Sequence, residues 1–383
     1  MTDAPIATCP FAAGTRGLDE PAPVRAEMRA AGPVVRAEAP AGGPVWIVTD
    51  PDLARAVLAD PKVSKDTALA PRTWGRWTAG LEPSAAEQPA LTTLEGQAHA
   101  RLRRAHAPLL GAKRMTASYP RMVAIARDLL APIAGEPVDL MADFSTRYPL
   151  TVLCELLGVP LDGVDTAMTA CRGMHSQDQS EVAAAMSAFT ELATAALNGG
   201  AGIATELAAR MPGDTSREDL HYQIFALLFA GQLTTDPALG FLVARLLGDP
   251  GSLAAPGSST AVDEAAVGEV LRLHPPAPFT LWRFTTTEIE LAGIRLPAGA
   301  PLLIDIEGVN AVTAPGGQDL AFGAGPHYCI GAQLARHELC ALAEVLRTRY
   351  PAARLTVPYA DLRRIEPGGI LGSRLAALPV VLR

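Results

Sequence analysis

A single cysteine just before a predicted helix constrains this chain more than any other sequence feature. Residues 322–331 read FGAGPHYCIG, and they run directly into a helical pattern over residues 332–339. The glycines of this segment can adopt positive φ or let the backbone approach a flat ligand closely. Cys329 precedes the helix N-terminus, where free N–H groups and the helix dipole favour a thiolate over a thiol. Such a thiolate can bind a metal whose properties are tuned by hydrogen bonds to the sulfur.

Cysteine count, charge and hydropathy exclude several classes of protein. The five cysteines are an odd, scattered set without CxxC spacing, which argues against a disulfide framework and a zinc site (Cys9, Cys154, Cys171, Cys329 and Cys340). The net charge of -8 gives no basic field over the whole chain, so we expect no nucleic-acid partner. No apolar run reaches the ~18 residues of a membrane span, and residues 1–15 lack the features of a secretory signal. We therefore expect a cytoplasmic protein without a membrane partner.

The order of predicted elements is mainly α with a β minority. Residues 44–49 read as a strand, and Asp50 then caps a helix that starts with a proline. Apolar spacing is mostly helical over residues 97–275. Short β segments follow at residues 279–284, 288–291 and 301–306, then a helix over residues 331–349 and terminal strands near Leu355 and Val380. Without an internal repeat or linker, residues 1–383 are expected to form one domain.

The cysteine segment resembles the heme-binding loop of the cytochrome P450 family. It matches every fixed position of the family pattern Phe-Gly-x-Gly-x-His-x-Cys-x-Gly, whereas a lone cysteine would usually be a small buried hydrophobic residue. The resemblance implies the cytochrome P450 fold, a helical body plus a β-rich region with heme between distal and proximal helices. It also implies heme b (iron protoporphyrin IX) as cofactor, with Cys329 as iron ligand and Phe322, His327 and Gly331 in the heme loop.

Further motifs extend the resemblance, in order, over nearly the whole chain. Glu269 and Arg272 look like the Glu-x-x-Arg pair of the family, and their i,i+3 spacing places both side chains on one helix face.

The two propionate carboxylates of heme need hydrogen-bond donors, because a buried anion without partners is costly. Four donor side chains around these two carboxylates are therefore chemically sensible. The residues that match the usual partners of the heme propionates are His99, Arg103, Arg283 and His327.

The predicted distal helix departs from the family pattern at one position. Residues 230–236 (AGQLTTD) match Ala/Gly-Gly-x-acid-Thr, except that Leu233 replaces the acid and cannot relay protons. Gly231 is expected to leave room for a ligand. Thr234 is expected to donate a hydrogen bond to the oxygen being activated, or to the carbonyl one turn earlier. Pro237 predicts a kink, because it removes one N–H and crowds the preceding turn.

A second departure lies between Ile306 and Ala321. Family members usually carry an Asn-Arg-Asp-Pro-like turn and a longer meander there, but this segment is short and contains no arginine. We therefore expect Glu269 and Arg272 to find another partner, or the proximal surface to be remodelled.

Family analogy also places a mostly apolar substrate pocket. Trp74 and Trp77 lie three positions apart, where they either stack on an aromatic or peptide-like substrate or anchor their loop onto the core. The other residues expected to line the pocket are Ala230, Thr235, Phe279 and Ile370.

A local group of basic residues is expected on the near-heme face. Such a group on an acidic protein suits a small acidic ferredoxin, with an attraction that falls as salt rises. Its members are Arg101, Arg104, Lys113, Arg114 and Arg336.

Three functions fit these features. The first is an oxidase that receives two electrons from ferredoxin and ferredoxin reductase. It would catalyse an oxidative tailoring step on a small molecule or peptide in natural-product biosynthesis, with coupling or cyclisation in preference to hydroxylation. The second is a peroxide-using enzyme or isomerase on the same heme. The third is a heme-bearing module that recruits a carrier protein or senses a gas without turnover, since retention of heme is not catalysis.

Overall fold

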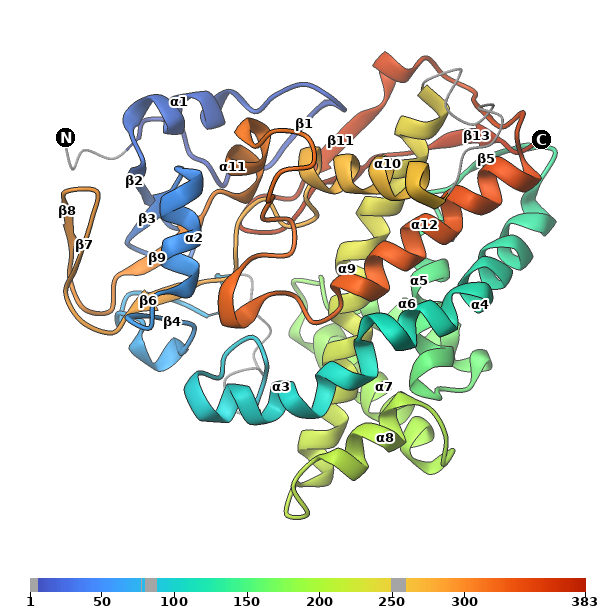
Figure 1. The fold of residues 1–383 in the computed structure, drawn as a ribbon, viewed down its shortest axis with the longest axis horizontal. Coiled ribbons are helices and arrows are strands. Elements are labelled where there is room, and N and C mark those ends of the chain that lie inside the picture. The colour runs from blue at the N-terminus through green and yellow to red at the C-terminus, as the bar shows by residue number, and fades with distance from the viewer. Residues whose placement is uncertain (1–5, 77, 80–87, 249–259) are drawn as a thin grey trace. The chain divides into compact units, whose positions relative to one another are not determined.

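The computed structural model of this chain describes residues 6–76, 78–79, 88–248 and 260–383. The chain divides into two compact units. Unit 1 comprises Met1–Ala100, Gly268–Cys329 and Arg363–Arg374, and unit 2 comprises Arg101–Val267, Ile330–Leu362 and Leu375–Arg383. Most strands belong to unit 1 and most helices to unit 2 (Figure 1), which confirms the mainly α chain with a β minority. The expectation of a single domain over residues 1–383 stays a prediction.

Unit 1 is built on a mixed five-stranded sheet with the strand order β2-β3-β9-β6-β4, in which β3 and β9 are parallel. These strands are β2 (Val34–Glu38), β3 (Pro44–Val48), β9 (Pro301–Ile304), β6 (Arg283–Thr285) and β4 (Val63–Ser64). Smaller β elements are β1 (Gly14–Gly17), β11 (Arg363–Glu366), β12 (Arg374–Leu375) and the hairpin of β7 (Ile289–Leu291) and β8 (Ile294–Leu296). The helices are α1 (Pro23–Ala31), α2 (Pro51–Ala59), α11 (Ile306–Val312) and the 3-10 turns η1 (Thr67–Leu69) and η5 (Gly325–His327).

Both faces of the unit 1 sheet are buried. Val45 and Ile47 of β3 pack into one apolar cluster, and the alternating residues Trp46 and Val48 pack into another. This is the two-residue period of a strand, with successive side chains on opposite faces. The helix α2 covers the second face through Val57 and its neighbours.

Unit 2 is a helical body in which α12 lies along α4 (Figure 1) and α5 packs on α9. Its helices are α4 (Ala112–Leu130), α5 (Phe144–Leu157), α6 (Val164–Gly173), α7 (Gln179–Asn198), α8 (Ile203–Arg210), α9 (Arg217–Gly248) and α12 (Ala332–Arg349). A small sheet has the strand order β10 (Arg354–Leu355), β13 (Pro379–Val381), β5 (Pro137–Asp139), and the 3-10 turns are η3 (Ala131–Ile133), η4 (Leu161–Gly163) and η6 (Tyr359–Asp361). The helices α3 (Gly96–Leu110) and α10 (Thr260–Leu273) contain residues of both units.

The long helix α9 forms the centre of unit 2. By length and composition it could cross a membrane, yet 61% of its most apolar window is buried within the structure. A mostly buried apolar helix is typical of a protein core.

Most predicted element boundaries agree with the structure, and two β predictions are corrected. The segment 279–284 contains only an isolated bridge at Phe279 before β6 begins at Arg283. The predicted strand over 301–306 ends at Ile304, because the carboxylate of Asp305 accepts a hydrogen bond from the N–H of Gly308 at 2.9 Å and caps α11.

We predict that Asp50→Ala lowers the free energy of unfolding by about 1 kcal/mol. The carboxylate of Asp50 caps α2 by accepting hydrogen bonds from the N–H groups of Asp52 (3.1 Å) and Leu53 (2.8 Å). Urea denaturation of the full chain measures the change. The control is Asp52→Ala, whose side chain is fully exposed and whose effect should stay within about 0.5 kcal/mol. Equal effects of the two substitutions would contradict the capping role.

Candidate active site

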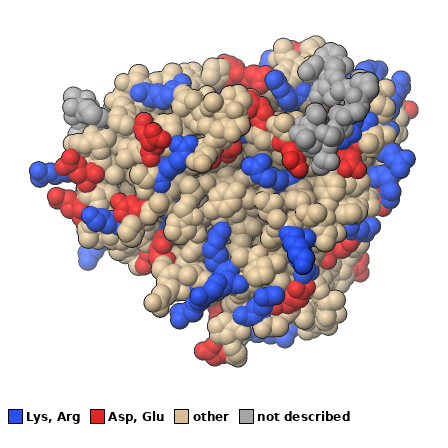
Figure 2. All heavy atoms as spheres, in the orientation of Figure 1, with Lys and Arg blue, Asp and Glu red and all other residues tan. Residues whose placement is uncertain are grey.

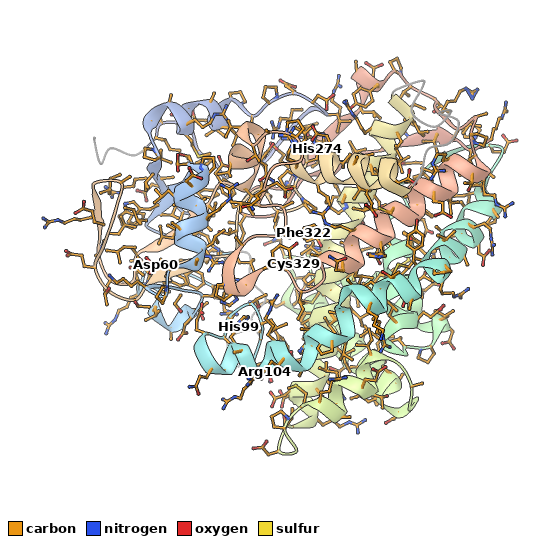
Figure 3. The ribbon with its side chains drawn as sticks, viewed as in Figure 1. Asp60, His99, Arg104, His274, Phe322 and Cys329 are labelled. Atoms are coloured by element: carbon orange, nitrogen blue, oxygen red, sulfur yellow. The ribbon has the colours of Figure 1, made fainter. Side chains whose placement is uncertain are left out.

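Cys329 lies in a loop that closes on itself. Its N–H donates to the carbonyl oxygen of Phe322 at 2.9 Å, so the two residues lie side by side (Figure 3). Gly325 has φ +70, and a Cβ atom there would lie 2.5 Å from the carbonyl oxygen of Leu58 in α2. Only glycine fits this approach. The loop is therefore held against α2, with the ring of Phe322 packed 6.3 Å from the ring of Tyr328.

The environment of Cys329 differs from that of most other cysteines in the chain. Cys154, Cys171 and Cys340 are buried, and burial raises the pKa of each thiol to about 12. These three thiols are therefore unreactive core residues. Cys329 is exposed, as is Cys9 far away in the sequence, but Cys329 alone of these five residues precedes a helix by three positions.

The helix after Cys329 begins as the sequence predicts. Gly331 is the N-cap of α12, and its carbonyl oxygen accepts a hydrogen bond from the N–H of Ala335 at 3.0 Å. The helix α12 therefore begins three positions after Cys329 in the chain.

Unit 1 gathers buried basic side chains from four separate segments. Lys65, Arg283 and His99 are at most 8% exposed, and the imidazole rings of His99 and His327 lie 4.1 Å apart between centroids. Glu95 joins them: its Oε1 accepts from the N–H of Lys65 at 2.6 Å, and its Oε2 lies 3.1 Å from Nε2 of His327. We call these five residues the cation cluster.

Among the residues that the structure describes, positive charge in the cation cluster exceeds negative charge, since Lys65 and Arg283 are cations and Glu95 is the carboxylate. Burial lowers the pKa of Lys65 to about 7, with Arg283 adding to the effect and Glu95 and Cys329 opposing it. Burial also lowers the pKa of Arg283 to about 10. The buried Nε of Arg283 has no hydrogen-bond partner within the described residues. Buried cations whose pKa values are lowered in this way are stabilised by anionic partners. The cluster therefore fits a ligand that carries two carboxylates, such as the propionates of heme.

Three of the four predicted propionate partners, His99, Arg283 and His327, thus belong to one cluster. Arg103 follows His99 by one turn in α3 and is half-buried. The cluster also contains Lys65 and Glu95, which sequence reasoning did not assign to the site. Glu95 stands directly before the helix of His99, and this position is the one sequence signal that pointed to it.

The pair of Glu269 and Arg272 forms as predicted. Nε and one terminal nitrogen of Arg272 donate to the two carboxylate oxygens of Glu269 at 2.8 and 2.7 Å. The other terminal nitrogen donates to the backbone carbonyl oxygens of Asn310 (2.7 Å) and Thr313 (2.9 Å). The segment between Ile306 and Ala321 contains no arginine, so another partner was expected for this pair. The backbone carbonyls of the same segment are that partner.

Asn310 joins the two ends of the short segment, a role that the sequence did not indicate. Asn310 is fully buried, and its Oδ1 accepts a hydrogen bond from the N–H of Leu320 at 2.7 Å. Leu320 is itself buried and stands two positions before Phe322. Asn310 therefore fixes the entrance to the cysteine loop.

The middle of α9 carries one open face. Between Asp219 and Ala244 of this helix, the exposed residues are Ala230 and Thr234, which are one turn apart. The hydroxyl of Thr234 donates to the carbonyl oxygen of Ala230 at 3.1 Å, one of the two bonds expected of it. Leu233 is half-buried beside them. This face can receive a ligand.

Two expectations for α9 are corrected. A Cβ atom at Gly231 would lie 2.9 Å from Cδ1 of Leu153 in α5, so this glycine permits close helix packing and the space beside it is filled. Thr235 is 3% exposed and bonds to Glu338 of α12, so its side chain does not line a pocket. Burial raises the pKa of Glu338 well above its usual range, which favours the neutral acid.

Asp236 does not replace the missing acid on the open face. It is buried, and its Oδ2 accepts from the hydroxyl of Thr146 at 2.6 Å and from Nε2 of Gln232 at 3.2 Å. The helix α9 continues through Pro237 as one helix, and the kink expected there stays a prediction.

The pocket candidates of unit 1 belong to its core. Trp74 packs edge-on against Trp282 and Phe284. Of the two roles expected for it, this arrangement is the one that anchors its loop onto the core. Phe279 is 2% exposed, and Ile370 is buried in the same cluster, because both fill the space under the sheet. Trp77 lies outside the described residues.

The predicted basic group is only partly available to a partner. Arg101, Arg104 and Lys113 of unit 2 are exposed, but Arg114 is held by both carboxylate oxygens of Glu206 at 2.7 Å. Figure 2 shows basic and acidic residues on the same face, separated by wide areas of other residues.

Known proteins resemble this chain over its whole length. It is 40% identical over 419 residues to the cytochrome P-450 monooxygenase DoxA of Streptomyces sp. strain C5, covering 99% of this chain and 98% of that protein. It is 30% identical over 395 residues to the cytochrome P450 monooxygenase PikC of Streptomyces venezuelae, covering 96% and 93%. No family model matches the chain.

Solved structures agree with this likeness. CYP154A1 from Streptomyces coelicolor A3(2) has a TM-score of 0.80 at 28% identity, covering 94% of this chain and 97% of its own. The cytochrome P450 MoxA from Nonomuraea recticatena has a TM-score of 0.83 at 27% identity, covering 100% and 99%. The fold and the cysteine site thus define a heme-thiolate enzyme. The chain belongs to the cytochrome P450 family, whose named relatives are monooxygenases.

We predict that Asn310→Ala lowers the free energy of unfolding by about 1–3 kcal/mol, because the buried N–H of Leu320 loses its acceptor. Urea denaturation of the full chain measures this change. Gln318→Ala is the matched control, since that side chain is exposed in the same segment and should cost at most about 0.5 kcal/mol. A similar cost for both variants would rule out the closing role of Asn310.

Proposed function

We propose that this chain is a heme b oxidoreductase that catalyses an oxidative tailoring step on a small molecule or peptide in natural-product biosynthesis. The observation that carries the proposal is the exposed Cys329 before α12, in the unit that also holds the cation cluster. Relatives such as PikC and the mycinamicin IV hydroxylase/epoxidase of Micromonospora griseorubida, 30% identical over 387 residues, support the monooxygenase class.

Cys329, the cation cluster and Thr234 have different proposed roles, because their side chains differ in chemistry. Cys329 would hold the iron of heme, and His99, Arg103, Arg283 and His327, joined by Lys65 of the cation cluster, would hold the propionates through charge and hydrogen bonds. A thiolate-held heme supplies the capacity to activate oxygen. Thr234 presents its hydroxyl on the open face of α9, where it can donate to a ligand when its bond to Ala230 is released.

For the reaction type, we propose oxidative coupling or cyclisation in preference to simple hydroxylation. Leu233 occupies the acid position, and the buried Asp236 is already hydrogen-bonded within the helical body. Proton supply on the open face is therefore restricted. A similar structure, CxnD, is described as forming a C–S bond in chuangxinmycin biosynthesis, with a TM-score of 0.82 at 25% identity over 95% of each chain.

For the electron supply, we propose ferredoxin and ferredoxin reductase in the cytoplasm. Arg101, Arg104 and Lys113 are exposed and can attract an acidic partner. Arg114 contributes less, because Glu206 neutralises it.

A second candidate function is peroxide use on the same heme. The specific observation in its favour is Leu233, since peroxide already carries the protons and electrons that a relay and a redox partner would supply. Product formation with peroxide alone, at the rate seen with ferredoxin, ferredoxin reductase and NAD(P)H, would favour this candidate over the first.

We predict that the purified protein gives the thiolate-type Soret band in its reduced carbon monoxide difference spectrum, and that Cys329→Ala abolishes it. Loss of the sulfur removes the iron ligand. Cys9→Ala is the matched control, because Cys9 is also exposed in unit 1 and should leave the band unchanged. A colourless wild-type protein that takes up no hemin would refute the proposed function.

We predict that Thr234→Ala lowers product formed per reducing equivalent about tenfold, the effect of losing one hydrogen bond of about 1.4 kcal/mol. The exposed hydroxyl of Thr234 is the donor that the substitution removes. NAD(P)H consumption and product are measured together, with Thr234→Ser as the control that retains the hydroxyl. Unchanged coupling in the alanine variant would exclude a donor role.

A further inference from the structure

His175 lies on the connection between α6 and α7, and its backbone is fixed there. Its N–H donates to the carbonyl oxygen of Arg172 at 3.1 Å, which continues the last turn of α6. Asp178, at the other end of the connection, caps α7 by accepting a hydrogen bond from the N–H of Ser180 at 2.8 Å. The connection is therefore held at both ends, and the backbone sets the position of His175.

The imidazole ring of His175 packs against the side chain of Phe229 in α9. The two ring centroids lie 5.8 Å apart, and the rings are tilted by 42°. Phe229 is in turn stacked on the buried Phe225 at 5.6 Å, so this contact fixes the ring of His175 against the helical body. His175 itself is exposed, and within the described residues no group forms a hydrogen bond to its ring nitrogens. Both nitrogens are therefore available to a ligand.

Phe229 stands at the edge of the open face of α9. With 3.6 residues per turn, each residue is rotated by about 100° from the one before it, so Phe229 and Leu233 share one side of the helix. Ala230 and Thr234 follow next around the helix, and none of these four residues is fully buried. His175 therefore lies beside the face that carries Thr234, on the side of Leu233.

The surroundings of His175 suit an uncharged oxygen. Loss of water around the ring lowers the pKa of His175 below its usual range, although the charge of Asp236 opposes this shift. The ring is therefore neutral at neutral pH, with one N–H donor and one acceptor nitrogen. Phe229 and Leu233 next to it are apolar. A ligand that matches both features has an apolar body and a hydroxyl or carbonyl group.

We propose that His175 is a specificity-determining residue that hydrogen-bonds a neutral oxygen of the substrate, while the apolar part of the substrate lies on the open face of α9. This inference rests on the proposed function, because it takes this face as the substrate side of the enzyme. A hydroxyl group can donate to the acceptor nitrogen of the ring, and a hydroxyl or carbonyl oxygen can accept from its N–H. The substrate class is thus an apolar compound that already carries a neutral oxygen.

The experiment measures the binding of 2-naphthol and naphthalene to the holoenzyme by equilibrium dialysis. The two probes share an apolar body and differ in one hydroxyl group, so the ratio of their Kd values reports the hydrogen bond. The wild-type protein should bind 2-naphthol more tightly. His175→Phe keeps a ring against Phe229, and it should lower this preference about threefold to tenfold, the effect of losing one hydrogen bond. The Kd for naphthalene should stay unchanged.

Two further variants separate hydrogen bonding from packing. His175→Gln retains a donor and an acceptor and should keep part of the preference. His221→Phe is the matched control, because His221 is a half-buried histidine of α9 whose Nε2 already lies 3.2 Å from the hydroxyl oxygen of Thr194. This control should keep the wild-type ratio.

Loss of the preference in His175→Phe, together with its retention in His221→Phe, would support the proposal. Equal binding of the two probes to the wild-type protein, failure to bind either probe, or an unchanged ratio in His175→Phe would overturn it. If His175→Phe does not fold, the ratio in His175→Ala decides by the same criteria. A wild-type protein that takes up no hemin would refute the proposed function, whereas normal hemin uptake with an unchanged ratio in the variant would refute only this inference.

Discussion

Buried positive charge without enough buried negative charge is the constraint on which the site of unit 1 depends. Lys65 and Arg283 are taken out of water, and Glu95 is the carboxylate that contacts this group. Folding such a cluster costs free energy that an anionic ligand recovers on binding.

The cysteine loop depends on a different kind of constraint, which is steric. Gly325 approaches the carbonyl of Leu58 so closely that no side chain fits between them, and the N–H of Cys329 returns to Phe322. The loop is therefore anchored to α2 on one side and continues into α12 on the other. An exposed thiol held in this way differs from the buried thiols elsewhere in the chain, whose raised pKa keeps them protonated.

The departures from the family pattern have separate physical consequences. The short segment loses an arginine, yet Arg272 keeps its full set of acceptors by using the carbonyls of Asn310 and Thr313. In α9, Leu233 stands in place of a carboxylate, and Asp236, three positions further on, is committed to Thr146. The first loss is compensated within the structure. The second leaves Thr234 as the polar side chain on the open face of α9, and the proposed reaction type rests on this departure.

The heme-thiolate class and the order of elements could be predicted from the sequence, because the cysteine motif and the helix and strand patterns each lie in contiguous residues. Cys329 and its glycines lie within ten positions, and the cap at Asp50 acts on its immediate neighbours. Only the tertiary structure decided the roles of Lys65, Glu95 and Asn310, since their partners are distant in the chain or are backbone groups without a residue signature. It also moved Gly231 from ligand space to helix packing, because the side chain that fills the space comes from Leu153 on another helix.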